Sequence, residues 1–513
     1  MRPVPAPPIP RIAEKLGLKN TRYLPPFGGR EERWVNRQRD LFRRYNPVYA
    51  CDNPRKMTGY NTRVQFNQRN MTAFGGLFLP LLFAERLGLR EPLRRALNHE
   101  GLVYGTDDLL LSSVASILAG APRLYDINVI RRDKGLAAAL GLEQLPEEGN
   151  LRKKLACASA EELEAMEQVN ATLFEKTNRT EDATTVGIDL DLTTVTVYGK
   201  QEGSEVGYNP KKPGRRCYQI AVCFLANNGD ALTAELRPGN TVASTDFERF
   251  WQKILSKLPS NYKVAVVRMD KGYFGDRIFR VLEASPDIFY VSGAPARNVL
   301  VAWARENLRF KPVSRSAESE EEQNGVRYFV AEGMYAFQTW EAPRRFVVVK
   351  KLTPNPDYDP DRVMVDIFGE PLVPPFLEEY TFYVTNFSPE QLDAEGVWHF
   401  YNERGTVENR VKESRLGFAL DKLPSHNFFG NAIYVQLVLF AYNLLNAFKR
   451  FLLPLEYQRK NIRWLRMHLL RLPALVTRKK LQWVVKFPIW ILDRRLVERP
   501  LRLLAEGKPY YVV

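Results

Sequence analysis

The chain has 513 residues, of which 45% are hydrophobic and 26% charged, values that exclude a wholly disordered protein and fit a folded protein of about two to four domains. Its 74 Lys and Arg against 59 Asp and Glu give a net charge of +15, an excess typical of proteins that bind nucleic acid or another polyanion. Residues 1–72 carry +10 and residues 449–513 carry +12, which leaves −7 for the residues between them. We therefore expect basic ends that hold phosphates and a centre that uses its carboxylates for another purpose.

Metal-binding and disulfide-forming side chains are scarce. The sequence has four cysteines and four histidines, with no Cys-x-x-Cys pair. This distribution excludes a disulfide scaffold and a thiolate zinc site, argues against a histidine-based metal site or triad, and fits a reducing compartment. The N-terminus has no apolar signal core, so we expect a soluble protein that is not secreted.

Two regions precede the first predicted sheet. Residues 1–72 are rich in Pro, Arg and Asn and show little periodicity, which predicts an extended basic arm. Residues 73–183 place apolar residues at helical spacing and predict a helical domain that binds DNA or assists in binding it. Two short helices around Pro146 allow a helix-turn-helix in this domain, although helical hairpins that read no DNA are commoner.

A change to β-structure is predicted at residue 184. Residues 184–199 alternate apolar side chains with Asp and Thr, as a half-buried strand does. Two further strands, at 217–226 and 231–237, flank Asn228-Gly229, which is a strong hairpin turn. These segments predict three strands that meander antiparallel to one another.

Helices and strands alternate after this meander. Thr245 and Glu248 predict a capping box at the start of a helix, and the nearly all-apolar residues 264–269 predict a strand at the buried centre of a sheet. A second helix and a strand at 288–292 follow. The order β-β-β-α-β-α-β makes residues 184–294 the first part of an RNase H-like catalytic core.

The remaining residues complete the predicted fold. Residues 295–376 hold four strand-like segments between Pro-rich connectors, the last at 363–367, and predict a β-rich insertion domain. Residues 377–425 return to the core with a strand and one long helix from 389 to about 415. Residues 426–513 predict a basic, helical C-terminal region, and amides interrupt its apolar first part, which indicates a buried helix rather than a membrane span. The predicted fold class is α/β, an RNase H-like mixed sheet interrupted by a β-rich insertion, with helical N-terminal and C-terminal regions.

Three acidic positions stand out by their place in this fold. Asp191, with Asp189 two residues before it, lies on the polar face of the first strand, Asp270 directly follows the central apolar strand, and Glu408 lies in the late helix. In an RNase H-like sheet the first and fourth strands are neighbours and the late helix crosses their ends, so we expect the three carboxylates to converge. Taken singly, each is more often a turn former or a solvated helix residue, but an unpaired carboxylate in an apolar strand is costly. Carboxylates without His or Cys suit Mg²⁺ or Mn²⁺, and two such ions catalyse phosphodiester displacement.

The late helix also carries the residues of a known signature. It reads Tyr401-Asn-Glu-Arg404-Gly-Thr-Val-Glu408, with Arg415 seven residues further on. This resembles the Tyr-x-x-Arg-x-x-x-Glu-x-x-x-x-x-x-Lys signature of bacterial insertion-sequence transposases of the DDE type, which have an RNase H-like core and a β-rich insertion before the Glu. IDLDLTTVTVYGKQEG, GYNPKKPGRRCY, AELRPGNT and VVRMDKGYF resemble the same group. The final Lys is replaced here by Arg415, with Lys412 one turn earlier, and Arg and Lys differ in geometry.

The resemblance implies a catalytic centre. Asp191, Asp270 and Glu408 are implied as catalytic residues and as ligands of two Mg²⁺ or Mn²⁺ ions. The family's first Asp usually stands shortly before a Thr, which favours Asp191 over Asp189.

The resemblance also implies DNA contacts. Tyr401 and Arg404 are implied to contact a phosphate at the transposon end, and their spacing places them on one helix face with Glu408. In this sequence, Arg415 or Lys412 supplies the positive charge that ends the signature.

Two weaker candidates for DNA contact lie outside the signature. The loop 201–216 is glycine-rich and basic, with Lys211, Lys212 and Arg215 able to clamp phosphates, although a merely solvated hairpin loop fits the pattern as well. Trp340 lies in the predicted insertion, and related transposases stack an insertion aromatic on a flipped base. A core position is the commoner role for such a Trp.

The function implied is that of a DNA transposase, which cleaves strands at transposon ends and transfers them into target DNA. We expect terminal inverted repeats and target DNA as partners, a homodimer in the DNA complex, no membrane, and a place at the bacterial nucleoid in the cytoplasm. The resemblance alone suggests a hairpin intermediate. The alternatives are another RNase H-like metal-dependent nuclease and a non-catalytic DNA-binding protein derived from a transposase.

Overall fold

The computed structural model describes residues 68, 70–98, 103–121, 123–313, 324–368, 371–480, 482–491 and 493–506. The chain divides into two units, Met1–Arg69 and Asn70–Val513, and the fold below is that of the second unit. The predicted basic arm lies outside the described residues except at its end, where Met71–Thr72 form strand β1. The predicted boundaries near residues 183, 294, 376 and 425 stay predictions.

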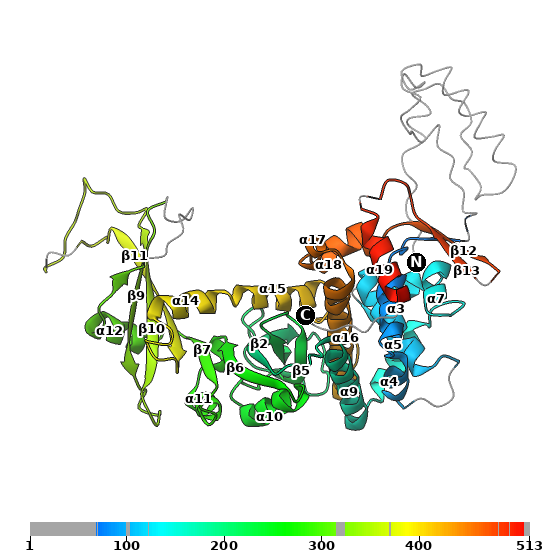
Figure 1. The fold of residues 1–513 in the computed structure, drawn as a ribbon. Helices are drawn as coiled ribbons and strands as arrows, with labels where there is room; N and C mark the ends of the chain where they lie inside the picture. Colours follow the sequence, from blue (N-terminus) through cyan, green and yellow to red (C-terminus); the bar gives the residue numbers. More distant parts are fainter. Residues whose placement is uncertain are drawn as a thin grey trace, which may run out of the picture. The chain divides into compact units, whose positions relative to one another are not determined.

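The centre of the fold is a mixed sheet (Figure 1). Its core strands are β2 (Thr184–Thr196), β4 (Arg216–Leu225), β5 (Ala231–Pro238), β6 (Tyr262–Met269) and β7 (Phe289–Ala294). β4 pairs antiparallel with both β2 and β5, whereas β6 pairs parallel with β2 and β7 pairs parallel with β6. The spatial order β5-β4-β2-β6-β7, with three antiparallel strands followed by two parallel ones, confirms the predicted RNase H-like sheet. The short strand β3 (Glu205–Val206) also pairs with β4.

Two amphipathic helices cover one face of this sheet. α10 (Phe247–Lys257) and α11 (Asp276–Glu283) bury their aromatic and aliphatic side chains in the same cluster as the apolar residues of β2 and β6. The predicted capping box of Thr245 and Glu248 is wrong. The N-cap of α10 is Asp246, which has a left-handed backbone (φ 51°) and makes no side-chain cap bond, because Asp tolerates that conformation and the chain turns there into the helix.

The predicted insertion continues the central sheet. After α12 (Asn298–Asn307), it contains β8 (Lys311–Pro312), β9 (Arg327–Tyr335) and β10 (Arg344–Pro354). β11 (Phe376–Thr385) pairs antiparallel with β7 on one side and with β10 on the other, which joins these strands to the core. The predicted strand at 363–367 is wrong. In the described part of this segment we find a single bridge, from Val365 to Pro371, since prolines around it withhold the N–H groups that a ladder needs.

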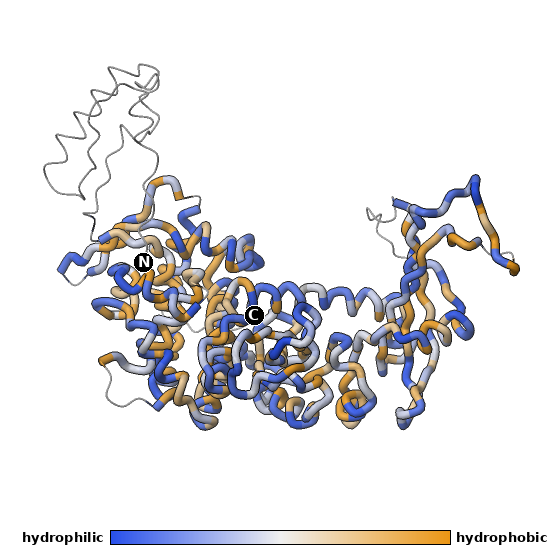
Figure 2. The backbone as a smooth tube through the Cα atoms, turned by 180° about the vertical axis from the view of Figure 1, so that it is seen from behind, coloured by the Kyte–Doolittle hydropathy of each residue, from blue (hydrophilic) through white to orange (hydrophobic). Residues whose placement is uncertain are grey.

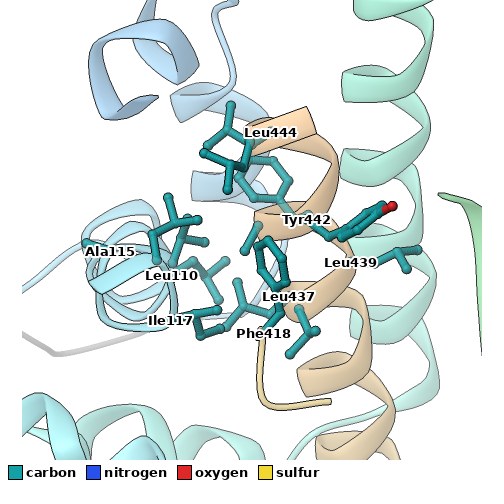
Figure 3. Packing of buried hydrophobic residues seen from close by; sticks show 14 of the residues in the cluster. Leu110, Ala115, Ile117, Phe418, Leu437, Leu439, Tyr442 and Leu444 are labelled. Carbon is teal, nitrogen blue, oxygen red and sulfur yellow. The ribbon is translucent and has the colours of Figure 1, made fainter. Parts of the chain in front are cut away.

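A helical region packs beside the edge strand β5. Its helices before the sheet are α3 (Phe78–Arg86), α4 (Arg90–Arg95), α5 (Thr106–Ala119), α6 (Ile127–Ile130), α7 (Lys134–Ala139), α8 (Glu148–Ala156) and α9 (Ala160–Thr177). Of these, α3, α5, α8 and α9 pack on α16 (Phe428–Leu452). Leu437 of α16 lies in one buried cluster with Leu110 and Ile117 of α5, as Figure 3 shows. The apolar stretches of the tube in Figure 2 gather in these buried helices and in the central strands.

The amides inside α16 bind the edge of the sheet. Asn443 donates to the carbonyl of Ala231 at 2.7 Å and accepts from its N–H at 2.8 Å, and Gln436 donates to the carbonyl of Ala234 at 2.8 Å. The helix thereby covers β5, whose outer backbone groups have no further strand to pair with. Among the described residues α16 alone has the length and hydropathy of a membrane span, and 89% of its most apolar window is buried inside the protein.

The C-terminal region was predicted to be helical, but it also contains two strands. It begins with α17 (Leu455–Gln458), α18 (Ile462–Leu465) and a π-helical turn, and it ends with α19 (Arg495–Glu506). Between them β12 (Ala474–Lys479) and β13 (Gln482–Lys486) form a hairpin that pairs with β1. Lys480 takes a positive φ of 53° in the hairpin turn, where no Gly or Asn in the sequence signals it.

Candidate active site

Two of the predicted carboxylates lie side by side. β2 and β6 are parallel neighbours whose register aligns Leu190 with Met269, so the next residue of each strand, Asp191 and Asp270, comes to the same edge. Strands in a sheet are about 4.8 Å apart, and the Asp191 carboxylate is close enough to raise the pKa of Asp270. The sheet register alone therefore brings together two acidic side chains that are 79 residues apart in the chain.

The environment of this pair disfavours its negative charge. Burial and the nearby Asp191 carboxylate raise the pKa of Asp270 to about 6, while Arg404 opposes the shift. Burial also raises the pKa of Asp191, against the opposing effect of Arg404. The backbone N–H of Gly272 donates to Asp270 at 3.0 Å and fixes its orientation. A cation placed at the pair would relieve both effects.

Asp189 has a different environment from Asp191. Its side chain is fully buried and accepts two hydrogen bonds from Arg268, at 2.7 and 3.1 Å, with Arg410 at 3.8 Å. Arg268 is the residue opposite Asp189 in the register of β2 and β6. Asp191 also has an arginine partner, Arg404, but its side chain is 13% exposed whereas that of Asp189 is fully buried. The geometry therefore favours Asp191 as the residue that a ligand can reach.

Glu408 lies near the pair but does not join it. It is on α15 (Gly405–Leu416), which packs against β2, and its side chain is 74% exposed. Arg404 stands between the two groups: it donates to Asp191 at 2.6 Å and lies 3.6 Å from the Glu408 carboxylate. Asp191 and Asp270 therefore lie together in the structure, whereas Glu408 is connected to Asp191 only through the buried Arg404.

Residues 55–508 match the family model described as Transposase DDE domain group 1. The chain belongs to this transposase family. No match was found among curated proteins. Among solved structures the chain is similar to the cryo-EM structure of the piggyBac transposase synaptic complex with hairpin DNA, at 11% identity and a TM-score of 0.36, covering 78% of this chain and 81% of that one. The predicted bacterial insertion-sequence origin stays a prediction.

The donor set of the transposase suits a hard divalent cation. Asp191 and Asp270 offer carboxylate oxygens of the kind that Mg²⁺ and Mn²⁺ prefer. In the described part of the chain, however, no three His, Cys, Asp or Glu side chains gather closely enough to hold a metal ion. The pair fits a metal, and a complete three-carboxylate site requires Glu408 to approach.

The signature helix is interrupted at the active site. One continuous helix was predicted, but α14 (Ala394–Asn402) ends before α15 begins. Arg268 donates to the carbonyl of Phe400 at 3.1 Å, and the N–H of Arg404 bonds to the carbonyl of Tyr401 at 2.8 Å instead of continuing the α-helical pattern. The guanidinium of a neighbouring strand therefore sets the turn that carries Arg404 toward Asp191.

Tyr401 faces the same site from the end of α14. Its ring lies 4.7 Å from that of Tyr383, and a Cβ on Gly293 would come within 2.7 Å of its hydroxyl. Burial raises the pKa of Tyr401 to about 12, with Arg404 opposing and Asp270 adding to the shift. The absence of a side chain at residue 293 is what leaves room for this hydroxyl. Contact of Tyr401 and Arg404 with a DNA phosphate stays a prediction.

Basic residues predicted to bind DNA gather beside the site. Lys211, Lys212 and Arg415 line one open groove of about 660 Å³. Arg215 is exposed on the same loop as the two lysines, and Lys412 is exposed on α15, but neither lines the groove. The groove thus joins the two predicted sources of positive charge, the loop after β2 and the end of the signature helix.

Trp340 lies in an aromatic cluster. Its ring is 5.1 Å from Phe337, 5.4 Å from Phe274 and 5.9 Å from Phe346, and the Arg344 guanidinium sits 5.1 Å from its centroid. This half-buried packing is the core role that was the commoner alternative for Trp340. Base stacking by Trp340 stays a prediction.

Sequence reasoning missed Arg268 and Arg410, which partner Asp189, and Gly293, which admits Tyr401. One signal was available for Arg268. It is the sole charged residue of the strand VAVVRM, and a buried charge requires a partner of opposite sign. Nothing in the local sequence identifies Arg410 or Gly293, because their partners are brought to them by the tertiary fold.

Proposed function

We propose that this transposase cleaves DNA strands at the ends of its element and joins them to target DNA, in a reaction that depends on divalent metal ions. The observation that carries the proposal is the partly buried pair of Asp191 on β2 and Asp270 directly after β6, neighbouring parallel strands, with raised pKa values. Such a pair has a use only if a cation or a proton neutralises it. The basic groove beside it supports DNA as the substrate.

Asp191, Asp270 and Glu408 are the residues proposed to hold Mg²⁺ or Mn²⁺. When bound, two such ions activate a water or a 3′-hydroxyl and stabilise the leaving oxygen of the phosphodiester. Asp191 becomes available to a ligand when Arg404 gives up its 2.6 Å contact. A DNA phosphate is the natural new partner for that guanidinium, since Arg binds phosphate as well as carboxylate with paired hydrogen bonds.

Tyr401 is proposed to position DNA rather than to exchange protons. Its pKa is raised to about 12, so the hydroxyl keeps its proton at neutral pH and donates to a phosphate oxygen. Its ring is fixed against Tyr383. With Arg404 it supplies two donors at the edge of the carboxylate pair.

The test uses DNA from the flanks of the gene, where we expect the inverted repeats of the element. The full chain is incubated with a labelled DNA carrying a cut end of the element and with plasmid target, in Mg²⁺ or in chelator. We expect strand-transfer products in Mg²⁺ alone, their loss in Asp270→Asn and Glu408→Gln, and their retention in the control Asp287→Asn, an exposed residue away from the site. Hydrolysis without joining favours another RNase H-like nuclease, and binding without any cleavage by the wild type favours a non-catalytic protein.

Assembly and location are part of the same proposal. Two element ends need two catalytic centres, so we propose a homodimer that forms on DNA, and a place at the nucleoid of a bacterial cell. Light scattering of the chain with and without an end DNA measures the first. A monomer in the complex with DNA contradicts it.

A further inference from the structure

The groove beside the carboxylate pair is strongly positive. It is lined by six cationic side chains, those of Arg123, Arg152, Lys211, Lys212, Arg415 and Lys422, against the single acidic side chain of Asp421. Two of the six have acidic neighbours, Arg152 with Glu148 at 2.8 Å and Lys422 with Asp421 at 3.2 Å. The remaining excess of positive charge calls for a polyanion.

Two elements run from the carboxylates into this groove. β2 carries Asp191 and reaches the groove wall at Val195, about 13 Å further along at the rise of a strand, and the residues that follow it continue the wall to Tyr198. α15 carries Glu408 and then Arg415, two helical turns or about 10 Å further on the same face. Arg415 is close enough to Asp191 to lower its pKa. The groove is therefore a direct continuation of the candidate active site.

The groove also contains exposed aromatic rings. Tyr198 is 77% exposed and Tyr125 is 61% exposed, and both line it. They come from separate parts of the chain, the end of β2 and the helical region before the sheet. Cations that follow a phosphate backbone, combined with rings on which bases stack, are the features of sites that bind single-stranded nucleic acid.

We infer that this groove holds DNA with unpaired bases as the strand enters the carboxylate site. Its volume of about 660 Å³ lies within the range of about 300–1,000 Å³ that encloses a small organic ligand, enough for one or two nucleotides and too little for a duplex. Stacking on Tyr198 and Tyr125 replaces the stacking that a base loses when it leaves the double helix. The inference rests on the proposed function, because it names the form of DNA that this active site receives.

Binding of two fluorescent probes to the full chain tests the inference: a mixed-sequence single strand of about twelve nucleotides and the duplex of the same sequence. Tyr198→Ala is expected to weaken the single strand at least about fivefold and the duplex less than twofold, while Tyr198→Phe keeps both affinities. Tyr208→Ala is the matched control, since Tyr208 is 75% exposed and lies outside the groove lining. Equal losses for the two probes, or no loss for either, overturn the inference.

The charge of the groove is tested by salt dependence. The double variant Lys211→Ala/Lys212→Ala is expected to reduce the slope of log affinity against log salt for the single strand by about 1.4, the value for two phosphate contacts. Lys153→Ala, an exposed lysine next to Arg152 but outside the groove, leaves the slope unchanged. An unchanged slope in the double variant contradicts the inference.

A direct map distinguishes this inference from the proposed function. A single strand carrying 5-iodouracil is photocrosslinked to the chain, and we expect crosslinked peptides that contain Tyr198 or Tyr125. Crosslinks confined to other peptides overturn the inference. If the crosslinks form at these tyrosines but the wild type cuts no element end, the groove stands and the proposed catalysis fails.

Discussion

The substitution Asp189→Asn tests whether Asp189 is a structural carboxylate, in contrast to Asp191, which is proposed to be catalytic. Asp189 is fully buried, and Arg268, with 6% of its side chain exposed, binds it through two hydrogen bonds. The amide of Asn has nearly the same shape, so packing is retained while the charge is lost. Breaking one side of a buried ion pair destabilises a protein by about 3–5 kcal/mol, because the remaining charge is left unmatched.

This free energy converts into a modest change in melting temperature. Unfolding entropy is about 2.1 cal/mol/K per residue, so for the unit Asn70–Val513 a loss of about 3–5 kcal/mol lowers Tm by about 3–5 °C. Differential scanning calorimetry of wild type and variant at neutral pH measures it. The variant is expected to retain metal-dependent strand cleavage at a temperature well below its Tm.

Asp191→Asn is the matched variant and has the opposite signature. Asp191 is also paired with a buried arginine, Arg404 at 2.6 Å, but burial outweighs that pair and raises the pKa of Asp191. A neutral Asn is therefore expected to lower Tm less than Asp189→Asn does. Cleavage is expected to disappear. The reasoning is refuted if Asp189→Asn abolishes cleavage without lowering Tm, or if Asp191→Asn continues to cut.

Three further predictions concern neighbouring parts of the structure. Because the fold raises the pKa of Asp270 from 3.8 to about 6, the stability this group contributes is fully present only below about pH 4 and is lost as pH rises through 6. In chelator Asp270→Asn therefore melts higher than wild type at pH 7.5, with a gap that falls to about half at pH 5 and closes near pH 4; an equal gap at pH 7.5 and pH 5 contradicts this. Gly293→Ala places a Cβ 2.7 Å from the Tyr401 hydroxyl, so we expect cleavage to fall at least about tenfold with a Tm loss of about 1–3 °C, whereas Gly149→Ala, which has open space around it, changes neither. Trp340→Ala removes the centre of an aromatic cluster and is expected to lower Tm by about 3 °C, with Trp340→Phe milder; a Tm unchanged by Trp340→Ala would instead support a ring held ready for a base.

The central sheet was predictable because its strands carry strong local patterns. The alternation over 184–196, the Asn228-Gly229 turn and the apolar residues 264–269 each determine a strand or turn within a few residues, and the structure places β2, β4, β5 and β6 there. The register of two parallel strands then carried Asp191 and Asp270 to one place. Such patterns predict strands reliably because the apolar side chains that identify a strand in the sequence are also the ones it buries in the core.

The turn at Arg404 could not be predicted, since its cause lies 136 residues away in the chain. Arg268 takes the carbonyl of Phe400, and no residue of the signature records that contact. The hairpin of β12 and β13 was also missed. Its turn places Lys480 at a positive φ, whereas hairpin turns are recognised in a sequence by the Gly or Asn that usually takes this conformation. In each case a tertiary contact or a backbone conformation determined the structure, and local propensity did not.

The sum of charge along the chain does not reveal the basic groove. Every cation of the groove, from Arg123 to Lys422, belongs to the middle segment, whose net charge is −7. In the folded chain, acidic side chains such as Asp189 pair with buried arginines such as Arg268. Lysines and arginines from the helical region, the loop after β2 and α15 lie together along one groove. Neutralising Lys211 and Lys212 should therefore reduce the salt dependence of single-strand binding even with both basic ends intact.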